Sequence, residues 1–491
     1  MFFNQIIFFP YLFLGMLIFK TINSYNNNSY AIYFLIIYSS IFYIINDPQF
    51  FLVLFISICI NYFFVIYYLR KRKKFLIILP IILNVLLILF FKYFPVFSNK
   101  SIDIYNVKTL YIPLGISFFT FQQISFIVDL YDKKIKKIKF NEYALYIIFF
   151  PQLVAGPIVK FNQVIHYFRD LSLFKDLYAS FAFIVIGLFK KIVLADNIGS
   201  YSDNLFNSLN TSVLSFFEAW IAVLLFSFQI YFDFSAYSDL AIGIALLFGV
   251  KLPENFYSPY KATNLIEFWK RWHISLSQFI KDYLYIKLGG SRNGLFVKHF
   301  NIIFSMAICG VWHGTGINFL IWGVYHGIFI SINHFIKSFN FELNEFISCF
   351  STFFIVIIGF AIFRCGSYES LINLLQSLFL FNGLSLPMSL QANIQNFDFL
   401  HFTGIFPNNL LDVKTIIPFI IFLFFIIFFC ENSQNLIGKQ FYTKYGNYNE
   451  KVAIINISRY KNHFFYLLGF LLFICSLCYS SGASNFIYFV F

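Results

Sequence analysis

Apolar segments long enough to cross a membrane constrain this chain more than any other feature of its sequence. A helix needs about 20 mainly apolar residues to span the hydrocarbon core, and lipid forces each spanning segment to satisfy its own backbone hydrogen bonds. Several apolar runs are short, so we expect about 10–12 spans together with tilted or re-entrant segments. The fold class is therefore an all-α polytopic membrane protein. The runs are 6–19, 33–45, 50–69, 75–91, 112–130, 181–194, 213–231, 240–250, 302–311, 317–336, 346–363, 416–429 and 464–478.

The composition excludes a water-soluble domain and argues against nucleic-acid binding. Only 12% of the residues are charged, whereas a soluble domain carries about 25%, and the mean hydropathy is +0.74. The net charge of +13 arises from cations between the apolar runs, where the positive-inside rule places them. We expect the lipid bilayer, and no nucleic acid, as the surroundings of this chain.

Two basic clusters, at 70–74 and 133–139, indicate the orientation. Both belong on the cytoplasmic side if the spans between them are counted, and the basic segment 438–462 belongs there too. Both termini are then expected outside, in the periplasm, and the first apolar run is expected to be retained as a helix. With no linker or repeat visible, we predict one domain over 1–491, divided into N-terminal helices (1–110), a core (111–340) and C-terminal helices (341–491).

His313 is the strongest candidate for chemistry. An ionisable group at membrane depth is costly and needs a partner, a cavity or a function. A neutral imidazole suits general-base catalysis near pH 7, and the glycines at 314 and 316 allow a ligand to approach closely. The alternative is a histidine that caps a helix by pairing with a carbonyl, and we favour the functional interpretation.

His273 lies in an amphipathic segment, 268–285, that we predict as a helix at the membrane interface. Its neighbours Lys270 and Arg271 suit an anionic phosphate, and Trp269 offers a face to an adenine or an acyl chain. The alternative is an interfacial anchor. The turn cluster 288–294 and the proline-broken segment 150–157 indicate a polar cavity inside the bundle, because irregular backbone at membrane depth is tolerated only there.

Other polar residues in the apolar region have alternative interpretations. His326 either supports the site or packs in the core. Asp233 and Asp239 are proton relays or partners of Lys and Arg, and we favour ion pairing. Cys475 and Cys478 have metal-site spacing without a second pair, so we expect neither a disulfide nor a metal site.

Several contiguous motifs resemble the membrane-bound O-acyltransferase family, in particular its bacterial branch that acetylates alginate or peptidoglycan. The resemblance implies one polytopic domain with a funnel, acetyl-CoA as the donor substrate from the cytoplasmic side, and no bound cofactor. It identifies His313 with the family's essential histidine and His273 with its second one. We assign donor binding to Trp269, Lys270, Arg271 and Trp312. The motifs are 112–123, 149–158, 189–196, 233–239, 267–277, 288–292 and 311–314.

The C-terminal residues 486–491 resemble the terminal hexapeptide of this branch, which implies that Tyr488 carries the acyl group. Val490 departs from a commoner polar residue at that position. A tyrosine hydroxyl is a poor nucleophile, with an ordinary pKa of ~10, and needs a base such as His313. From the residues alone, Tyr488 would be taken as an aromatic anchor at the interface.

The function predicted on this basis is acetyl transfer across a bacterial inner membrane. Acetyl passes from acetyl-CoA to Tyr488 and then to the serine of a periplasmic SGNH-type transferase, which O-acetylates peptidoglycan. The alternatives are O-acetylation of alginate or another exopolysaccharide, and then D-alanylation of teichoic acid. A transporter is the rival from another class, because broken helices, intramembrane acids and a cavity suit one equally.

Overall fold

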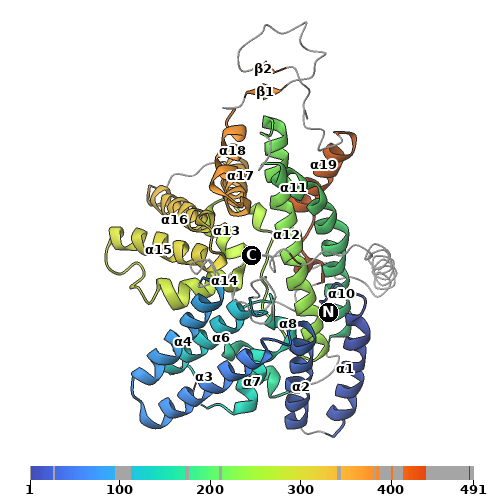
Figure 1. Cartoon of the computed structure of the whole chain (residues 1–491), viewed down its shortest axis with the longest axis vertical. Coiled ribbons are helices and arrows are strands. Elements are labelled where there is room, and N and C mark those ends of the chain that lie inside the picture. The colour runs from blue at the N-terminus through green and yellow to red at the C-terminus, as the bar shows by residue number, and fades with distance from the viewer. Residues whose placement is uncertain are drawn as a thin grey trace.

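The computed structural model describes residues 2–25, 28–93, 112–135, 137–171, 176–209, 213–339, 344–380, 383–385, 400–401, 413–437 and 486. Within these residues the chain is a helical bundle (Figure 1), which confirms the predicted all-α class. The exception is one parallel pair of two-residue strands, β1 (Leu384–Ser385) and β2 (Leu400–His401). The helices are α1 (Phe8–Asn23), α2 (Asn28–Asn46), α3 (Phe51–Lys71), α4 (Phe75–Lys92), α6 (Ile116–Tyr131), α7 (Phe140–Ile148), α8 (Phe150–Leu153), α9 (Phe161–Phe168), α10 (Leu177–Leu188), η1 (Phe189–Ala195), α11 (Asp196–Ser208), α12 (Phe216–Leu247), η2 (Pro259–Lys261), α13 (Leu265–Arg271), α14 (Ile274–Ile280), η3 (Lys281–Tyr285), α15 (Leu295–His313), α16 (Ile317–Ser338), α17 (Glu345–Arg364), α18 (Tyr368–Leu378), α19 (Val413–Phe429) and α20 (Ser433–Ile437).

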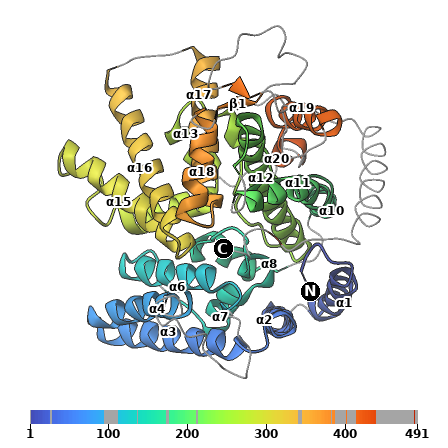
Figure 2. The ribbon, with the colours of Figure 1, turned by 45° about the horizontal axis from the view of Figure 1, so that its top comes forward.

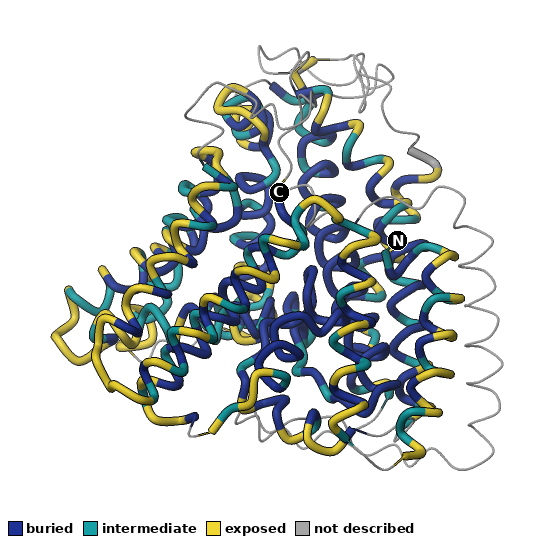
Figure 3. Tube along the Cα trace, turned by 60° about the horizontal axis from the view of Figure 1, so that its bottom comes forward, coloured by how far each residue is buried: buried dark blue, intermediate teal, exposed yellow. Residues whose placement is uncertain are grey.

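Eight helices among the described residues are long and apolar enough to cross a membrane: α2, α3, α4, the continuous stretch α10–η1–α11, α12, α15, α16 and α17. Two shorter apolar helices, Phe8–Asn23 and Thr415–Phe429, accompany them. Buried positions concentrate where helices meet, and exposed positions lie on the outward faces (Figure 3). Many of the exposed side chains are Phe, Ile and Leu, which suits a lipid-facing surface. The predicted run 464–478 lies outside the described residues, and the total of 10–12 spans and the threefold division of the chain stay predictions.

Helix α12 is the central element of the bundle. Helices α2, α3, α4, α6 and α7 gather on one side of the molecule, and α10, α13 and α15–α19 lie around the other end of α12 (Figure 2). The Ser215 hydroxyl accepts from the amide of Glu218, and the Glu218 carboxylate accepts from the amide of Ser215, so a capping box begins the helix. In its most apolar window 89% of the residues are buried, so α12 packs against other protein rather than lipid.

The separation of 213–231 and 240–250 into two apolar segments was wrong, because α12 runs through both as one helix. The polar residues between them stay inside the helix since each has a cation nearby. Lys191 Nζ lies 2.7 Å from an Asp233 carboxylate oxygen, and Lys190 Nζ lies 2.7 Å from an Asp239 carboxylate oxygen. The preference for ion pairing at Asp233 and Asp239 is therefore confirmed.

The prediction of a single amphipathic helix over 268–285 was also wrong, because that helix is interrupted. The helical structure is interrupted at His273, whose backbone adopts a left-handed conformation (φ 41°). It resumes as α14 and then as the π-helix η3. A bulky residue with positive φ is uncommon and persists only where its surroundings hold it. The break divides the segment into two short helices with different directions.

The two basic clusters used for the orientation lie at the same end of the bundle. The ring of Tyr68, just before the first cluster, lies 6.4 Å from the ring of Tyr131, just before the second. Lys287, next to the turn 288–294, pairs with Asp132 at 2.8 Å. This proximity supports one common side for all three segments, and its assignment to the cytoplasm stays a prediction.

Candidate active site

The close packing of α15 on α16 places His313. A Cβ atom on Gly310 would lie 2.1 Å from the carbonyl oxygen of Phe319, and one on Gly314 would lie 2.1 Å from the Phe319 ring. Only glycine permits this approach, which is the usual device for joining membrane helices closely. His313 is the last residue of α15 and is buried at 7% exposure, so the imidazole lies in the interior of the bundle.

Asn255, from the loop after α12, holds the chain break that presents His273. The Asn255 carbonyl oxygen accepts from the amide of Ile274 at 3.0 Å. Its side-chain oxygen accepts from the Ser275 hydroxyl at 2.6 Å, and that hydroxyl accepts from the amide of Ile158 at 2.9 Å. Ile158, which directly follows the proline-broken segment 150–157, therefore supports the start of α14, beside His273.

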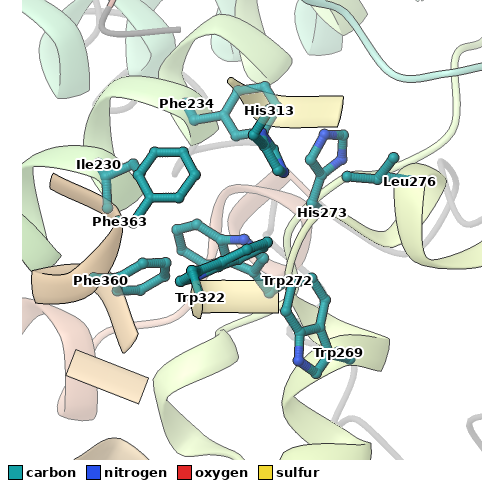
Figure 4. Close-up of a pocket in the computed structure, with 10 residues that line it drawn as sticks. All are labelled: Ile230, Phe234, Trp269, Trp272, His273, Leu276, His313, Trp322, Phe360 and Phe363. Carbon is teal, nitrogen blue, oxygen red and sulfur yellow. The ribbon is translucent and has the colours of Figure 1, made fainter. Parts of the chain in front are cut away.

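The two histidines line one cavity, although 40 positions separate them in the sequence. The cavity is small, about 20 Å³, which is room for about one water molecule, and both imidazole rings point into it (Figure 4). Of the described side chains that line it, only the two histidines carry an ionisable group; the rest are aromatic or aliphatic. The lining residues are Ile230, Phe234, Trp269, Trp272, His273, Leu276, His313, Trp322, Phe360 and Phe363.

Aromatic rings fix the direction of both imidazoles. The His313 ring meets Trp322 at 5.2 Å and Phe363 at 5.3 Å between centroids, both nearly perpendicular, and the His273 ring meets Phe234 at 4.6 Å. Edge-to-face pairs at these distances are favourable and directional. Burial lowers the pKa of His273, which lies outside the candidate spans, to about 3. Its imidazole is therefore neutral at physiological pH.

Of the four residues predicted to bind the donor, only Trp269 lines the cavity. The guanidinium of Arg271 donates to Glu267 at 2.5 Å, and Lys270 is exposed. The Trp312 ring stacks on Phe121 at 4.9 Å. A donor that contacts Lys270 or Arg271 would therefore do so beside the cavity rather than within it.

His326 lies behind the cavity, one layer from His313. It is fully buried, and its ring contacts Trp269 at 5.2 Å and Trp322 at 5.0 Å. A Cβ on Gly359 would lie 2.6 Å from His326 Nε2, so α17 packs directly on this ring. Neither ring nitrogen has a hydrogen-bond partner among the described residues. Tight packing behind two cavity walls suits a supporting position.

Tyr488 lies outside the described residues, but Phe486 of the same tail is described. The Phe486 side chain is buried at 1% exposure, with its ring centroid 4.6 Å from Lys191 Nζ and 4.9 Å from the Tyr237 ring. Asp233 and Tyr237 of α12 thus lie at the Phe486 contact, while Ile230 and Phe234 of the same helix line the cavity. The start of the terminal hexapeptide is held on the face of α12 next to the cavity.

Sequence reasoning missed most of the cavity wall, including Ile230, Phe234, Trp322, Phe360 and Phe363. Apolar residues in apolar helices carry no local signal that separates a wall from a core. Within the described ranges no group of three His, Cys, Asp or Glu side chains is placed to hold a metal ion. The arrangement offers proton transfer at two imidazoles in an apolar cavity.

Comparison with known proteins places the chain in a family. The family model described as "MBOAT, membrane-bound O-acyltransferase family" matches residues 37–371. The chain belongs to this family. This membrane-bound O-acyltransferase is 39% identical over 343 residues to the peptidoglycan O-acetyltransferase of Helicobacter pylori, covering 62% of the chain and 65% of the relative.

Two further relatives of this MBOAT protein carry different names. It is 32% identical over 330 residues to the probable alginate O-acetylase AlgI of Pseudomonas aeruginosa, covering 64% of the chain and 62% of the relative. It is 27% identical over 243 residues to the teichoic acid D-alanyltransferase of Bacillus subtilis, covering 46% of the chain and 60% of the relative. The chain thus spans somewhat less than two thirds of the length of each of these curated relatives.

Proposed function

We propose that this chain is an acetyltransferase of the bacterial inner membrane that moves acetyl from cytoplasmic acetyl-CoA to Tyr488 and then to a periplasmic partner. The observation that carries the proposal is the shared cavity of His313 and His273 inside a bundle of membrane helices. The relatives named for O-acetylation of peptidoglycan and alginate support the same class of reaction.

The proposed chemistry assigns the proton to His313. Its imidazole accepts the proton of the Tyr488 hydroxyl while the phenolic oxygen attacks the thioester carbonyl. The C–S bond breaks, and the imidazolium returns the proton to the sulfur, so that CoA leaves as a free thiol. The products are acetyl-Tyr488, CoA and the original neutral imidazole.

The surroundings of the cavity suit this step. His273, neutral because of its burial, carries one ring N–H donor and one acceptor nitrogen beside the reacting group. The aromatic walls exclude water, which would otherwise hydrolyse the thioester or the aryl ester. Tyr488 reaches the reaction only if the tail brings it to the cavity, and the Phe486 contact on α12 supports that placement.

In the second half of the proposed reaction, a serine of the periplasmic SGNH-type partner attacks acetyl-Tyr488. The phenolic oxygen leaves more readily than an alkoxide because its conjugate acid has a pKa near 10. The acetyl-serine then transfers its group to a hydroxyl of peptidoglycan. The 39% identity to a peptidoglycan O-acetyltransferase favours this acceptor.

Purified protein supplied with acetyl-CoA labelled in the acetyl group tests the proposal. The wild-type chain is expected to acquire label on Tyr488, located by mass spectrometry after proteolysis. His313→Ala is expected to acquire none, and Tyr488→Phe is expected to bind acetyl-CoA without acquiring label. Normal labelling of His313→Ala would show that His313 is not the base. Label on a residue other than Tyr488 would show that Tyr488 is not the acyl carrier.

O-acetylation of alginate or another exopolysaccharide is the second candidate, supported by the 32% identity to a probable alginate O-acetylase. The first half-reaction is the same, so the acceptor decides between the two. A neighbouring gene for a secreted SGNH-type enzyme next to cell-wall genes would favour peptidoglycan, and a polysaccharide synthesis cluster would favour the second. If the protein consumed no acetyl-CoA, D-alanyl transfer or transport would become the favoured function.

A further inference from the structure

Two consecutive side chains at the end of α4 bind the C-terminal end of the helix that carries His313. Lys92 Nζ donates to the carbonyl oxygens of Trp312 at 2.5 Å and His313 at 2.8 Å. The Tyr93 hydroxyl contacts the carbonyl oxygens of Val311 and Gly314, the latter at 3.2 Å. Four successive carbonyls of α15 and its cap are thus bound by α4, more than 200 positions earlier in the chain.

These contacts satisfy carbonyl groups at the C-terminal end of α15 that have no hydrogen-bond donor within the helix. The last carbonyls of a helix have no partner within the helix, and at membrane depth water does not satisfy them. Gly314 follows α15 in extended backbone (φ −167°, ψ 174°) rather than in the left-handed conformation that usually satisfies these groups. A cation at a helix C-terminus also complements the helix dipole.

Lys92 is a buried cation at the C-terminal end of α15. It is buried at 6% exposure and forms no ion pair with a carboxylate among the described residues. Its Nζ lies 5.7 Å from the centroid of the Trp312 ring, so the ammonium also contacts the side chain next to His313. A buried lysine without a counter-ion is costly, and a residue needed only for packing would be served better by Met or Leu.

We infer that Lys92 is a positioning residue for His313: it fixes the end of α15, and with it the direction of the imidazole, through the carbonyls of Trp312 and His313. Tyr93 assists from the flanking carbonyls. The catalytic consequence rests on the proposed function, whereas the structural clamp does not. Because a displacement of about 1 Å at a reacting group costs about 100-fold in rate, loss of the clamp should act on catalysis before it acts on folding.

The test compares Lys92→Met with Lys92→Arg and Asn84→Leu. Asn84 is a matched control because it is buried on the same helix and bonds Asn61 and Pro80 rather than α15. Lys92→Met is expected to lower kcat for acetyl-CoA consumption about 100-fold while KM changes little. Lys92→Arg, which keeps the charge and the donors, is expected to recover most of that loss. Asn84→Leu should leave kcat near the wild-type value.

Hydrogen–deuterium exchange on the same folded, size-selected proteins keeps the clamp separate from the proposed reaction. Faster exchange of the amides of 310–316 in Lys92→Met, but not in Asn84→Leu, would support the clamp even if the wild type consumed no acetyl-CoA, a result that would overturn the proposed function alone. Unchanged exchange at 310–316, or equal losses of kcat in Lys92→Met and Asn84→Leu, would overturn the clamp.

Discussion

Two buried polar regions lie on neighbouring faces of α12, and they are built in opposite ways. In the charge cluster, formed by Lys190, Lys191, Asp196, Asp233 and Asp239, every charged side chain has an ion-pair partner at 2.7–2.8 Å. The cavity places His313 and His273 among aromatic walls around a small space. In a bundle surrounded by lipid, full pairing is typical of a structural role, and a titratable group facing a cavity is typical of chemistry.

The largest effect is expected where the cavity loses its base. His313→Asn should slow acetyl-CoA consumption about 10³-fold, within the 10²–10⁴ range of general-base catalysis. Its unfolding midpoint should stay close to that of the wild type, because the residue ends a helix and asparagine keeps a polar side chain there. Thiol release measured with a chromogenic reagent gives the rate. A rate within tenfold of the wild type would contradict the assignment of the chemistry to the cavity rather than to the charge cluster.

The next largest effect is expected in the charge cluster, on stability. Asp233→Ala removes the charged hydrogen bond between Asp233 and Lys191 but leaves Lys191 paired with Asp196, and should destabilise the fold by about 1.5–3 kcal/mol. Thermal unfolding in detergent measures the loss.

The matched control for Asp233→Ala is the triple variant Asp233→Leu/Lys191→Met/Asp196→Asn, which removes Lys191 together with both of its carboxylate partners. It should recover much of the lost stability, since well-packed apolar residues often replace a buried pair without cost. If Asp233→Ala kept wild-type stability but lost activity as completely as His313→Asn, the charge cluster would belong to the reaction.

A smaller effect is expected where the two regions meet, at Phe486. Removing its ring uncovers Lys191 and loses a cation–π contact worth about 2 kcal/mol when desolvated. Phe486→Ala should therefore slow labelling of Tyr488 roughly 30-fold, and Phe486→Tyr should preserve most of the rate. Labelling at the wild-type rate in Phe486→Ala would show that the tail does not depend on this contact.

The smallest effect is a pH dependence of stability from His273. Its pKa is about 3 in the fold because of burial, against about 6.5 unfolded, so the unfolded chain binds more protons between these values. The contribution of His273 to the free energy of unfolding is fully present above about pH 6.5. It decreases at lower pH, by about 2 kcal/mol at pH 5. Unfolding midpoints at pH 7.5 and 5 should differ less in His273→Gln than in the wild type. Equal shifts in both proteins would place His273 in contact with water.

The sequence predicts the helices well because lipid imposes a local rule. A spanning segment must be long, apolar and helical, and each of these properties is visible in a window of 20 residues. The same rule makes a histidine among such segments conspicuous, so His313 and His273 were identified without their neighbours. Their shared cavity depends on several elements and was expected only from irregular backbone elsewhere in the chain.

The remaining features depend on contacts between distant residues. The continuity of α12 requires Lys191, 42 positions before Asp233, and the break at His273 requires Asn255. The clamp joins Lys92 to His313 across 221 positions. In the sequence, Lys92 is only a cation at the end of an apolar run, where a lysine side chain ordinarily extends to water at the interface. No local pattern distinguishes it from a residue that faces water.

The most direct test of the central claim is an experimental structure with an acetyl-CoA analogue that cannot transfer its acetyl group. The account predicts the acetyl carbonyl inside the cavity, within reach of His313 and His273 and against the Trp322 and Phe363 rings. An analogue bound at saturation outside the cavity, with both imidazoles still enclosed by protein, would contradict it.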